Sequence, residues 1–244
     1  MKVFFYLISK IPKPFIVFSV DLFIYTKFYR FTKYYKITKV NLGIAYKDLS
    51  SENLENLSKL SIRESLIGIY ETFYTWGRGH VYSNSKIFKI KNNFLLKNKL
   101  NEGRGLIAVS IHNRSVDMLL KWINSQITTV SLYKKIKNKF LDKFVKNDRQ
   151  HNGAKCYETS YKGVKEILKT LNEKKAVCFA ADQVPQRGMG EYIKFYGTDA
   201  YSTTLVQSLA EKTKAEVLYV YLNSSNLGFL SISIKQPFEY VYNV

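Results

Sequence analysis

A histidine and a carboxylate at a short spacing are the residues of this chain best suited to acid–base chemistry. His112 follows the apolar run 105–111, and Asp117 comes after four intervening residues. A carboxylate that accepts a hydrogen bond from one imidazole nitrogen leaves the other nitrogen available as a base. A solvated histidine and an aspartate at the positive end of a helix dipole would give the same pattern. The pair is therefore a candidate catalytic base with its orienting acid.

The elements around this pair place it at the edge of a sheet. Residues 105–111 are apolar and bounded by glycine and polar residues, which predicts a short buried strand. Residues 115–124 predict a helix that begins after Ser115 as its N-cap. His112 then follows the end of the strand, and Asp117 lies in the first turn of the helix. In α/β proteins this edge is where ligands and catalytic groups gather.

Predicted strands and helices alternate along the rest of the chain. A helical pattern opens at Ser50 and ends at Gly77 and Gly79. Beyond the central motif, the predicted strands are 127–133, 154–157, 175–181, 192–196 and 216–222, and the predicted helices are 136–146, a helix capped by Ser160, and 201–212. This alternation predicts an α/β fold with a mostly parallel central sheet flanked by helices. We expect one catalytic α/β domain over residues 40–244.

Two further polar sites lie at the ends of predicted elements. Arg149 comes just after the basic helix, and Asp182 follows the apolar run 176–181. Loops at the carboxyl edge of a parallel sheet converge on one crevice, so His112, Arg149 and Asp182 could reach the same site. A solvated charge at a helix end would also explain Arg149, and a turn before Pro185 would also explain Asp182.

Composition narrows the class of partner. The chain has 38 Lys and Arg against 19 Asp and Glu, a formal net charge of +19, which favours an anionic partner such as a nucleic acid, a membrane surface or an acidic protein. A hydrophobic content of 46% excludes a disordered chain. Cys156 and Cys178 lie inside predicted strands, as reduced core residues do. Together with three scattered histidines they show no metal-ligand spacing, so we expect no metal and no cofactor.

The first 39 residues are apolar, aromatic and basic. The apolar runs 3–8 and 15–25 are separated by lysines and prolines, and each is shorter than the roughly 18 to 20 residues of a spanning helix. Residues 27–39 interleave Lys and Arg with Phe and Tyr, a mixture typical of membrane interfaces, where each basic residue adds about 1 kcal/mol on an anionic leaflet. We expect residues 1–39 to form a membrane-associating helical segment, although an aromatic-rich core helix would show the same pattern.

The order of these features resembles that of the lipid A biosynthesis acyltransferases, the late acyltransferases of Gram-negative bacteria. That family has an apolar strand ending in His, four residues and then an acid, a Tyr-Arg pair, an Arg-rich stretch ending in Gly, an Asp-Gln after a buried strand, and a Phe-x-Gly before a later helix. The matching positions here are His112, Asp117, Tyr133, Lys134, Arg149, Gly153, Asp182, Gln183, Phe195 and Gly197, and Asn41 with Leu42 resembles the family's N-terminal Asn-Leu. The resemblance covers nearly the whole chain in the correct order.

The chain departs from the family pattern at several positions. Asp117 stands where the family usually has Glu, Lys134 replaces an Arg, and Asn113 and Arg114 replace an aromatic-led pair. The His-to-Asp form is typical of glycerolipid acyltransferases, but this chain lacks the Glu-Gly-Thr-Arg block with which those enzymes bind the phosphate of glycerol phosphate. These departures bear on the identity of the acyl acceptor more than on the reaction class.

The resemblance implies a membrane-associated O-acyltransferase at the cytoplasmic face of the inner membrane. It would move a fatty acyl chain from an acyl carrier protein thioester to a hydroxyl of an anionic, lipid A-type glycolipid precursor. His112 would be the general base and Asp117 its orienting acid, with Arg149 and Asp182 completing the catalytic set. The residues expected to contact substrate are Arg114, Tyr133, Lys134 and Gln183.

Three alternatives stay open. The chain could acylate another lipid such as a glycerophospholipid, or it could be an inactive family member that serves as a membrane-bound scaffold. A basic nucleic-acid-binding protein is the alternative from a different class, but the sequence has no zinc spacing, RNA-binding aromatic signature or basic tail, so we expect no nucleic-acid partner. The basic stretch 134–146 is either a docking surface for the carrier protein or a solvated helix face.

Overall fold

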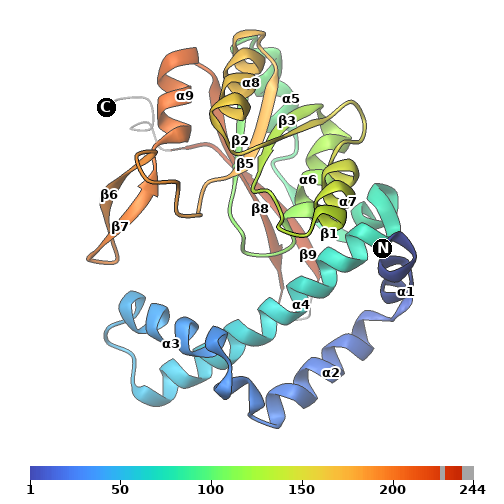
Figure 1. The fold of residues 1–244 in the computed structure, drawn as a ribbon, viewed down its shortest axis with the longest axis vertical. Coiled ribbons are helices and arrows are strands. Elements are labelled where there is room, and N and C mark those ends of the chain that lie inside the picture. Colours follow the sequence, from blue (N-terminus) through green and yellow to red (C-terminus); the bar gives the residue numbers. More distant parts are fainter. Residues whose placement is uncertain (226–228, 238–244) are drawn as a thin grey trace.

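The computed structural model describes residues 1–225 and 229–237, and a seven-stranded sheet lies at its centre (Figure 1). The strand order is β1-β9-β8-β2-β5-β3-β4. The strands are β1 (Ile87–Lys91), β2 (Leu106–Ser110), β3 (Thr129–Tyr133), β4 (Lys155–Glu158), β5 (Ala176–Ala180), β8 (Glu216–Ser224) and β9 (Leu230–Lys235). Neighbouring strands run parallel except β8 and β9, which are antiparallel. The predicted mostly parallel α/β fold is confirmed.

Helices cover both faces of this sheet. The core on one face includes α5 (Phe94–Asn101) and α6 (Val116–Gln126), and the core on the other includes α8 (Tyr161–Asn172) and α9 (Leu205–Thr213). Strand β2 is buried along its whole length because its side chains alternate between the two cores. The predicted caps are confirmed, since the Ser115 hydroxyl accepts from the Met118 N–H and the Ser160 hydroxyl accepts from the Gly163 N–H.

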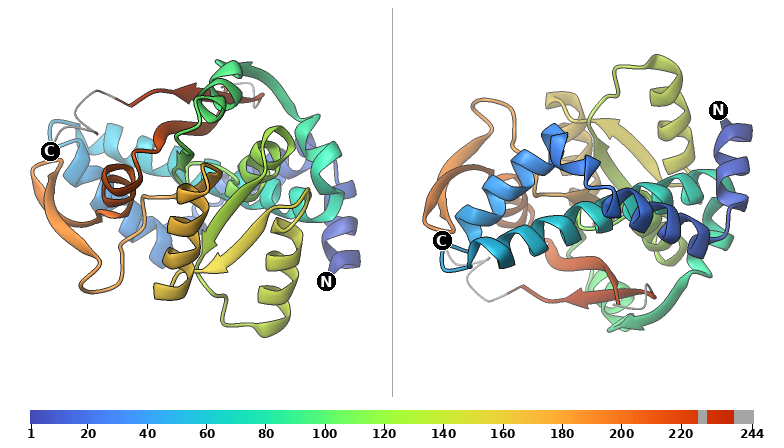
Figure 2. Two further views of the ribbon diagram at one scale, coloured as in Figure 1. Left: turned by 90° about the horizontal axis from the view of Figure 1, so that it is seen from above. Right: turned by 90° about the horizontal axis from the view of Figure 1, so that it is seen from below.

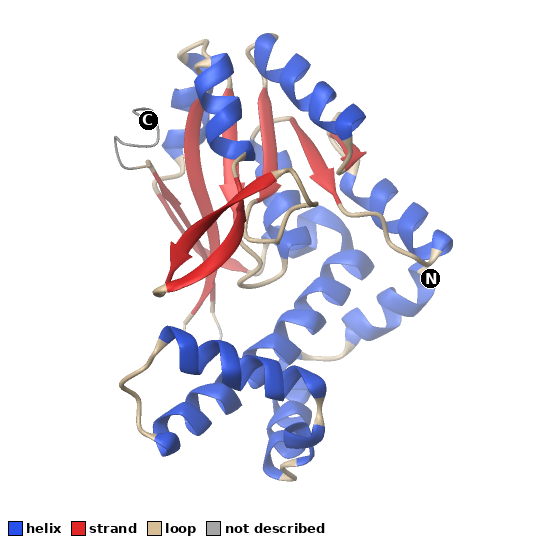
Figure 3. Cartoon of the chain, turned by 60° about the vertical axis from the view of Figure 1, so that its left-hand side comes forward, coloured by secondary structure: helices blue, strands red, loops and turns tan. Residues whose placement is uncertain are grey.

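The N-terminal helices form a separate layer below the sheet (Figures 1 and 3). Helices α1 (Lys2–Lys10), α2 (Lys13–Tyr25) and α3 (Lys33–Ala45) pack along the long helix α4 (Ser51–Asn84). Gly77 permits the closest approach, because a Cβ there would overlap the carbonyl oxygen of Phe5. The predicted end of α4 near Gly79 is instead a break, with φ 75° and ψ −178°, after which the helix continues. The expected domain boundary after residue 39 falls inside α3.

No single helix in the described ranges is long and apolar enough to cross a membrane. Residues 2–9 and 13–25 together have the length and composition of a span, but the two segments meet at an angle of 88°. The membrane association expected for residues 1–39 stays a prediction.

A two-stranded hairpin projects from the sheet on the side away from α7 (Lys139–Arg149) (Figures 1 and 2). Its strands are β6 (Gly190–Phe195) and β7 (Thr198–Thr203), joined by Tyr196 and Gly197, both with positive φ. The prediction of a helix over 201–212 is wrong at its start, because its first three residues pair with β6 and α9 begins only at Leu205. Pairing between the strands overrides local helical periodicity there.

Besides β7, the sequence prediction missed strands β1 and β9 and helix α5. Strand β1 lies at one edge of the sheet, and β9 pairs with both β1 and β8. The segment of α5 was predicted neither as a helix nor as a strand, and its Leu96 is fully buried. Strand β1 and helix α5 are short, lysine-containing and weakly periodic, whereas β9 alternates apolar and polar residues, which is a signal for a strand.

Candidate active site

His112 and Asp182 form a hydrogen-bonded pair at the carboxyl edge of two neighbouring strands. Strands β2 and β5 pair with Ser110 opposite Ala180, so His112 and Asp182 each lie two residues beyond this matched position. Asp182 Oδ1 lies 2.7 Å from His112 Nδ1, and Asp182 Oδ2 accepts from the His112 backbone N–H at 2.7 Å. The two contacts hold the imidazole in one orientation and keep Nε2 away from the carboxylate.

This arrangement keeps Asp182 ionised and His112 in one tautomer. Burial raises the pKa of Asp182, but the hydrogen bonds from the backbone and imidazole of His112 outweigh burial and lower the pKa below its usual range. An ionised carboxylate only accepts, so Nδ1 carries the proton and Nε2 keeps its lone pair. Gln183 Nε2 lies 3.3 Å from His112 Nε2, where its amide N–H can donate until a substrate hydroxyl takes that place.

Asp117 is not the hydrogen-bond partner of the imidazole, which corrects the sequence prediction. Its buried carboxylate accepts from Arg149 Nε at 2.6 Å and from Arg149 Nη2 at 3.2 Å. Asp117 lies in the first turn of α6 and Arg149 in the last turn of α7, so the pair joins two helices. Strand pairing brings Asp182 to the imidazole. Helix packing brings the Arg149 guanidinium to Asp117, to which it donates from two nitrogens.

Arg149 also differs in place from the prediction, since it belongs to α7 and does not follow it. Burial would lower the pKa of Arg149, but the charge and hydrogen bonds of Asp117 raise it above the usual value. The guanidinium therefore stays charged although it is largely buried.

A cavity of about 780 Å³ opens beside His112. The carboxyl ends of β2, β3 and β5 and the loop after β5 contribute to its walls. Its polar lining includes His112, Arg149, Gln183, Tyr133 and Lys134, and its apolar lining includes Val116, Leu119, Leu120, Val164, Phe179 and Leu205. The size lies within the range of small-molecule sites, and a lining that combines apolar side chains with His112 suits an acyl chain with a reactive carbonyl.

The thiol in this cavity is not suited to carry an acyl group. Cys178 lines the cavity, and burial raises its pKa to about 12, so near neutral pH it stays a protonated thiol. Burial also raises the pKa of Cys156. The chemistry of the site therefore favours direct transfer assisted by the imidazole over a covalent acyl-cysteine intermediate.

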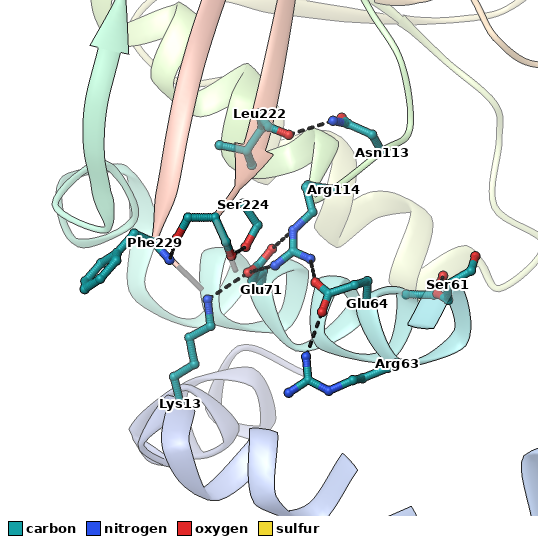
Figure 4. Close-up of polar contacts among 12 residues, drawn as sticks. Lys13, Ser61, Arg63, Glu64, Glu71, Asn113, Arg114, Leu222, Ser224 and Phe229 are labelled. Carbon is teal, nitrogen blue, oxygen red and sulfur yellow. Dashed lines mark hydrogen bonds and ion pairs between the residues drawn. The ribbon is translucent and has the colours of Figure 1, made fainter. Parts of the chain in front are cut away.

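The predicted substrate residues divide between two places. Tyr133, Lys134 and Gln183 line the cavity beside His112, and the Tyr133 hydroxyl donates to Asp142 at 3.3 Å. Arg114 does not line it, which corrects the expectation for this residue. Its guanidinium donates to both carboxylate oxygens of Glu71 and to Glu64, at 2.5 to 3.0 Å (Figure 4). With each of its three guanidinium nitrogens bonded to a carboxylate, Arg114 is placed to tie the loop after His112 to α4.

The sequence analysis missed Glu71 altogether. Its side chain is only 3% exposed, and Arg114 and Lys13 both pair with it. Ile67, Tyr70 and Tyr74 are buried at helical spacing on α4, and Glu71 lies on the same face. An acidic residue on this apolar face was the signal in the sequence. A buried carboxylate needs a cationic partner. Arg114, two residues after His112, is the arginine closest in sequence to the proposed base.

Comparison with known proteins identifies the family of the chain. A family model for the bacterial lipid A biosynthesis acyltransferases matches residues 2–231. The match includes the three strands that end at the cavity and the residues His112, Arg149 and Asp182. No curated protein matches in a sequence search. Because the family model covers nearly the whole length, the chain belongs to the bacterial lipid A biosynthesis acyltransferase family.

Proposed function

We propose that this chain transfers a fatty acyl group from an acyl carrier protein thioester to a hydroxyl of a lipid A-type glycolipid precursor. Membership of the family supports an acyltransferase with a lipid acceptor. The observation that carries the proposal is the His112–Asp182 pair, whose imidazole lines a cavity with many apolar side chains. The net charge of +19 suits both an acidic carrier protein and an anionic acceptor.

In the proposed reaction His112 acts as general base. Its Nε2 takes the proton of the acceptor hydroxyl as that oxygen attacks the thioester carbonyl, and a tetrahedral oxyanion forms. Collapse of this intermediate breaks the carbon–sulfur bond, and the leaving thiolate takes the proton back from the imidazolium. Asp182 stabilises the imidazolium through Nδ1. A positioned base of this kind contributes roughly 10²- to 10⁴-fold to the rate.

Arg149 and Asp117 have supporting roles in the proposal. Arg149 lines the same cavity, and we assign its positive charge to the stabilisation of the oxyanion. Asp117 acts through Arg149, since its carboxylate sets the direction of the guanidinium. Lys134 at the cavity wall is the proposed contact for an anionic group of the acceptor or of the carrier's prosthetic arm.

The N-terminal helices are the proposed membrane contact, at the cytoplasmic face of the inner membrane. Phe15, Phe18, Phe28 and Phe31 are each about two thirds exposed or more. A group of exposed aromatic side chains beside lysines and arginines is the composition of a surface that binds anionic lipid headgroups.

The enzymatic proposal is tested by incubating the purified full-length chain with an acyl-loaded carrier protein and a lipid A precursor that has free hydroxyls. Mass spectrometry should detect an acceptor heavier by one acyl chain. A parallel reaction with the same acyl group on coenzyme A tests the donor, and a lysophospholipid tests the acceptor. Transfer to the lysophospholipid alone would overturn the acceptor assignment, and transfer from coenzyme A alone would overturn the carrier protein.

The membrane proposal is tested by sedimentation with phosphatidylglycerol vesicles. We expect the chain to sediment with them and to be partly released by salt. The double substitution Phe28→Ser and Phe31→Ser should weaken binding several-fold. Tyr161→Ser is the matched control, because Tyr161 is equally exposed but lies on α8. Unchanged binding of the double variant would refute this contact surface.

A further inference from the structure

A second cavity, of about 820 Å³, lies between α4, the turn from α1 to α2, and the ends of β8 and β9. Within the described part of the chain, the two cavities share no lining residue. Helix α6 and the loop before it stand between them, since His112 and Leu119 line the first cavity while Arg114 and Met118 line the second. The second cavity is therefore a separate space next to the candidate active site.

The carboxylates in the wall of this second cavity are already neutralised. Glu71 accepts from Arg114 and from Lys13, and Glu64 accepts from Arg114 and from Arg63 (Figure 4). These two acids and three of the basic residues thus form one network, which Arg63 extends to Asp21. The charge of the remaining basic residues at the cavity is not balanced by them.

Three basic side chains at this cavity have no carboxylate partner among the residues that the structure describes. They contact tyrosine rings, with Lys10 Nζ 4.9 Å and Arg78 Cζ 5.8 Å from the centre of the Tyr6 ring, and Lys86 Nζ 5.6 Å from that of Tyr74. Tyr6 links Lys10 to Arg78, and Tyr74 lies one helical turn before Arg78 on α4. The three cations therefore form a cluster interleaved with aromatic rings.

Arg78 supplies a second, independent sign that a ligand group is expected. Its Nε atom is buried and has no hydrogen-bond partner among the described residues. A buried guanidinium N–H without an acceptor is rare in native structures. Arg78 lines the cavity, where a bound anionic oxygen would give its guanidinium an acceptor and offset the repulsion within the cluster.

The rest of the lining is apolar. It includes Ile11, Pro12, Val17, Leu60, Ile67 and Leu230. A cluster of cations beside an apolar wall matches a molecule with an anionic head and a hydrocarbon tail. Free phosphate would occupy only the cationic part.

We propose that the second cavity binds a lipid with a phosphate monoester headgroup, with the phosphate against Lys10, Arg78 and Lys86 and an acyl chain along the apolar wall. A phosphate has enough acceptor oxygens for several donors at once, and lysine and arginine are its usual partners. A lipid is the favoured source because the turn from α1 to α2, which lines the cavity, belongs to the N-terminal layer with the exposed aromatic side chains.

Calorimetric titration of the full-length chain tests this site. The probes are dihexanoyl phosphatidic acid below its critical micelle concentration, dihexanoyl phosphatidylcholine and inorganic phosphate. Phosphatidic acid should bind at least tenfold more tightly than either of the others. Equal binding of phosphatidylcholine would overturn the anion site. Equal binding of inorganic phosphate would overturn the lipid and leave a site for free phosphate.

Substitutions then locate the site. The pair Arg78→Gln and Lys86→Gln should weaken phosphatidic acid binding tenfold or more. The pair Lys165→Gln and Lys169→Gln removes the same charge from α8 and should leave binding unchanged. An equal loss in both pairs would show that only net charge matters and would overturn the proposal. Since Arg78 is partly buried, Lys10→Gln with Lys86→Gln, two exposed lysines, repeats the test if the first pair unfolds.

One further variant separates this inference from the proposed function. His112→Ala removes the candidate base of the first cavity and should bind phosphatidic acid as the unmodified chain does. Loss of binding in that variant would place the lipid in the first cavity and overturn the second site. Acyl transfer by the unmodified chain without any phosphatidic acid binding would likewise overturn the second site alone.

Discussion

Two hydrogen-bonded pairs at the same edge of the sheet differ in burial, and the difference separates a base that can exchange a proton from a pair that joins two helices. The side chains of His112 and Asp182 are 43% and 34% exposed, whereas those of Arg149 and Asp117 are 18% and 7% exposed. An imidazole open to solvent can exchange a proton with a substrate. A buried pair cannot lose one charge without leaving the other uncompensated. Solvent access thus distinguishes His112 and Asp182 from the Arg149–Asp117 pair, which joins α6 to α7. The spacing of residues in the sequence does not report solvent access.

The strongest test of this comparison removes the exposed imidazole. His112→Ala should lower acyl transfer by roughly 10²- to 10⁴-fold, because the general base is lost. The free energy of unfolding in urea should change by about 0.5 kcal/mol or less, as is usual for exposed side chains. Near-normal transfer from the acyl carrier protein by this variant would exclude His112 as the base.

The matching test of the buried pair should show a large loss of stability. Asp117→Ala leaves Arg149 largely buried without its carboxylate, and the free energy of unfolding should fall by about 3–5 kcal/mol. Asp117→Glu is the conservative control, since it keeps the charge and should recover part of this loss. Urea unfolding followed by circular dichroism measures both variants. If Asp117→Ala were as stable as the unmodified chain, the architectural role of the pair would be refuted.

A milder change tests how Asp182 acts. In Asp182→Asn the side chain keeps its shape, but its amide group can donate to His112 Nδ1. His112 Nε2 would then carry the proton and could not act as the base. We expect transfer to fall on the order of 10²-fold, with a much smaller change in stability than for Asp117→Ala. Asp182→Glu should restore part of the activity by restoring the acceptor. Full activity of Asp182→Asn would mean that the carboxylate does not set the tautomer.

The smallest expected effect is on stability in acid. The pKa of Asp182 is lower in the folded chain than in the unfolded chain. Its contribution to stability is therefore fully present above the unfolded value near pH 4 and is lost as the pH falls through the folded pKa. The thermal midpoint of the unmodified chain should drop more steeply between about pH 5 and pH 2 than that of Asp182→Asn. Parallel curves would show that the His112 contacts do not stabilise the ionised form.

Prediction from the sequence succeeded where local chemistry decides the structure. The apolar runs that became β2 and β5 are buried on both faces, and the serine caps of α6 and α8 form the hydrogen bonds that their position predicts. Prediction failed where pairing between strands or packing outweighs the local pattern. Residues 201–203 have helical periodicity but pair with β6, α5 is short and weakly periodic, and β9 takes its place by pairing with β8 and with the distant β1.

The sequence by itself determined which residues gather at the carboxyl edge, because strand ends and helix starts are local features. Only the tertiary structure decided how they pair. Matched register between β2 and β5 carries Asp182 to His112, and the packing of α7 on α6 carries Arg149 to Asp117. A spacing of four residues permits a contact between His112 and Asp117 but cannot require one. Each carboxylate takes the donor that the folded chain brings closest, and burial then decides which pair stays accessible to substrate.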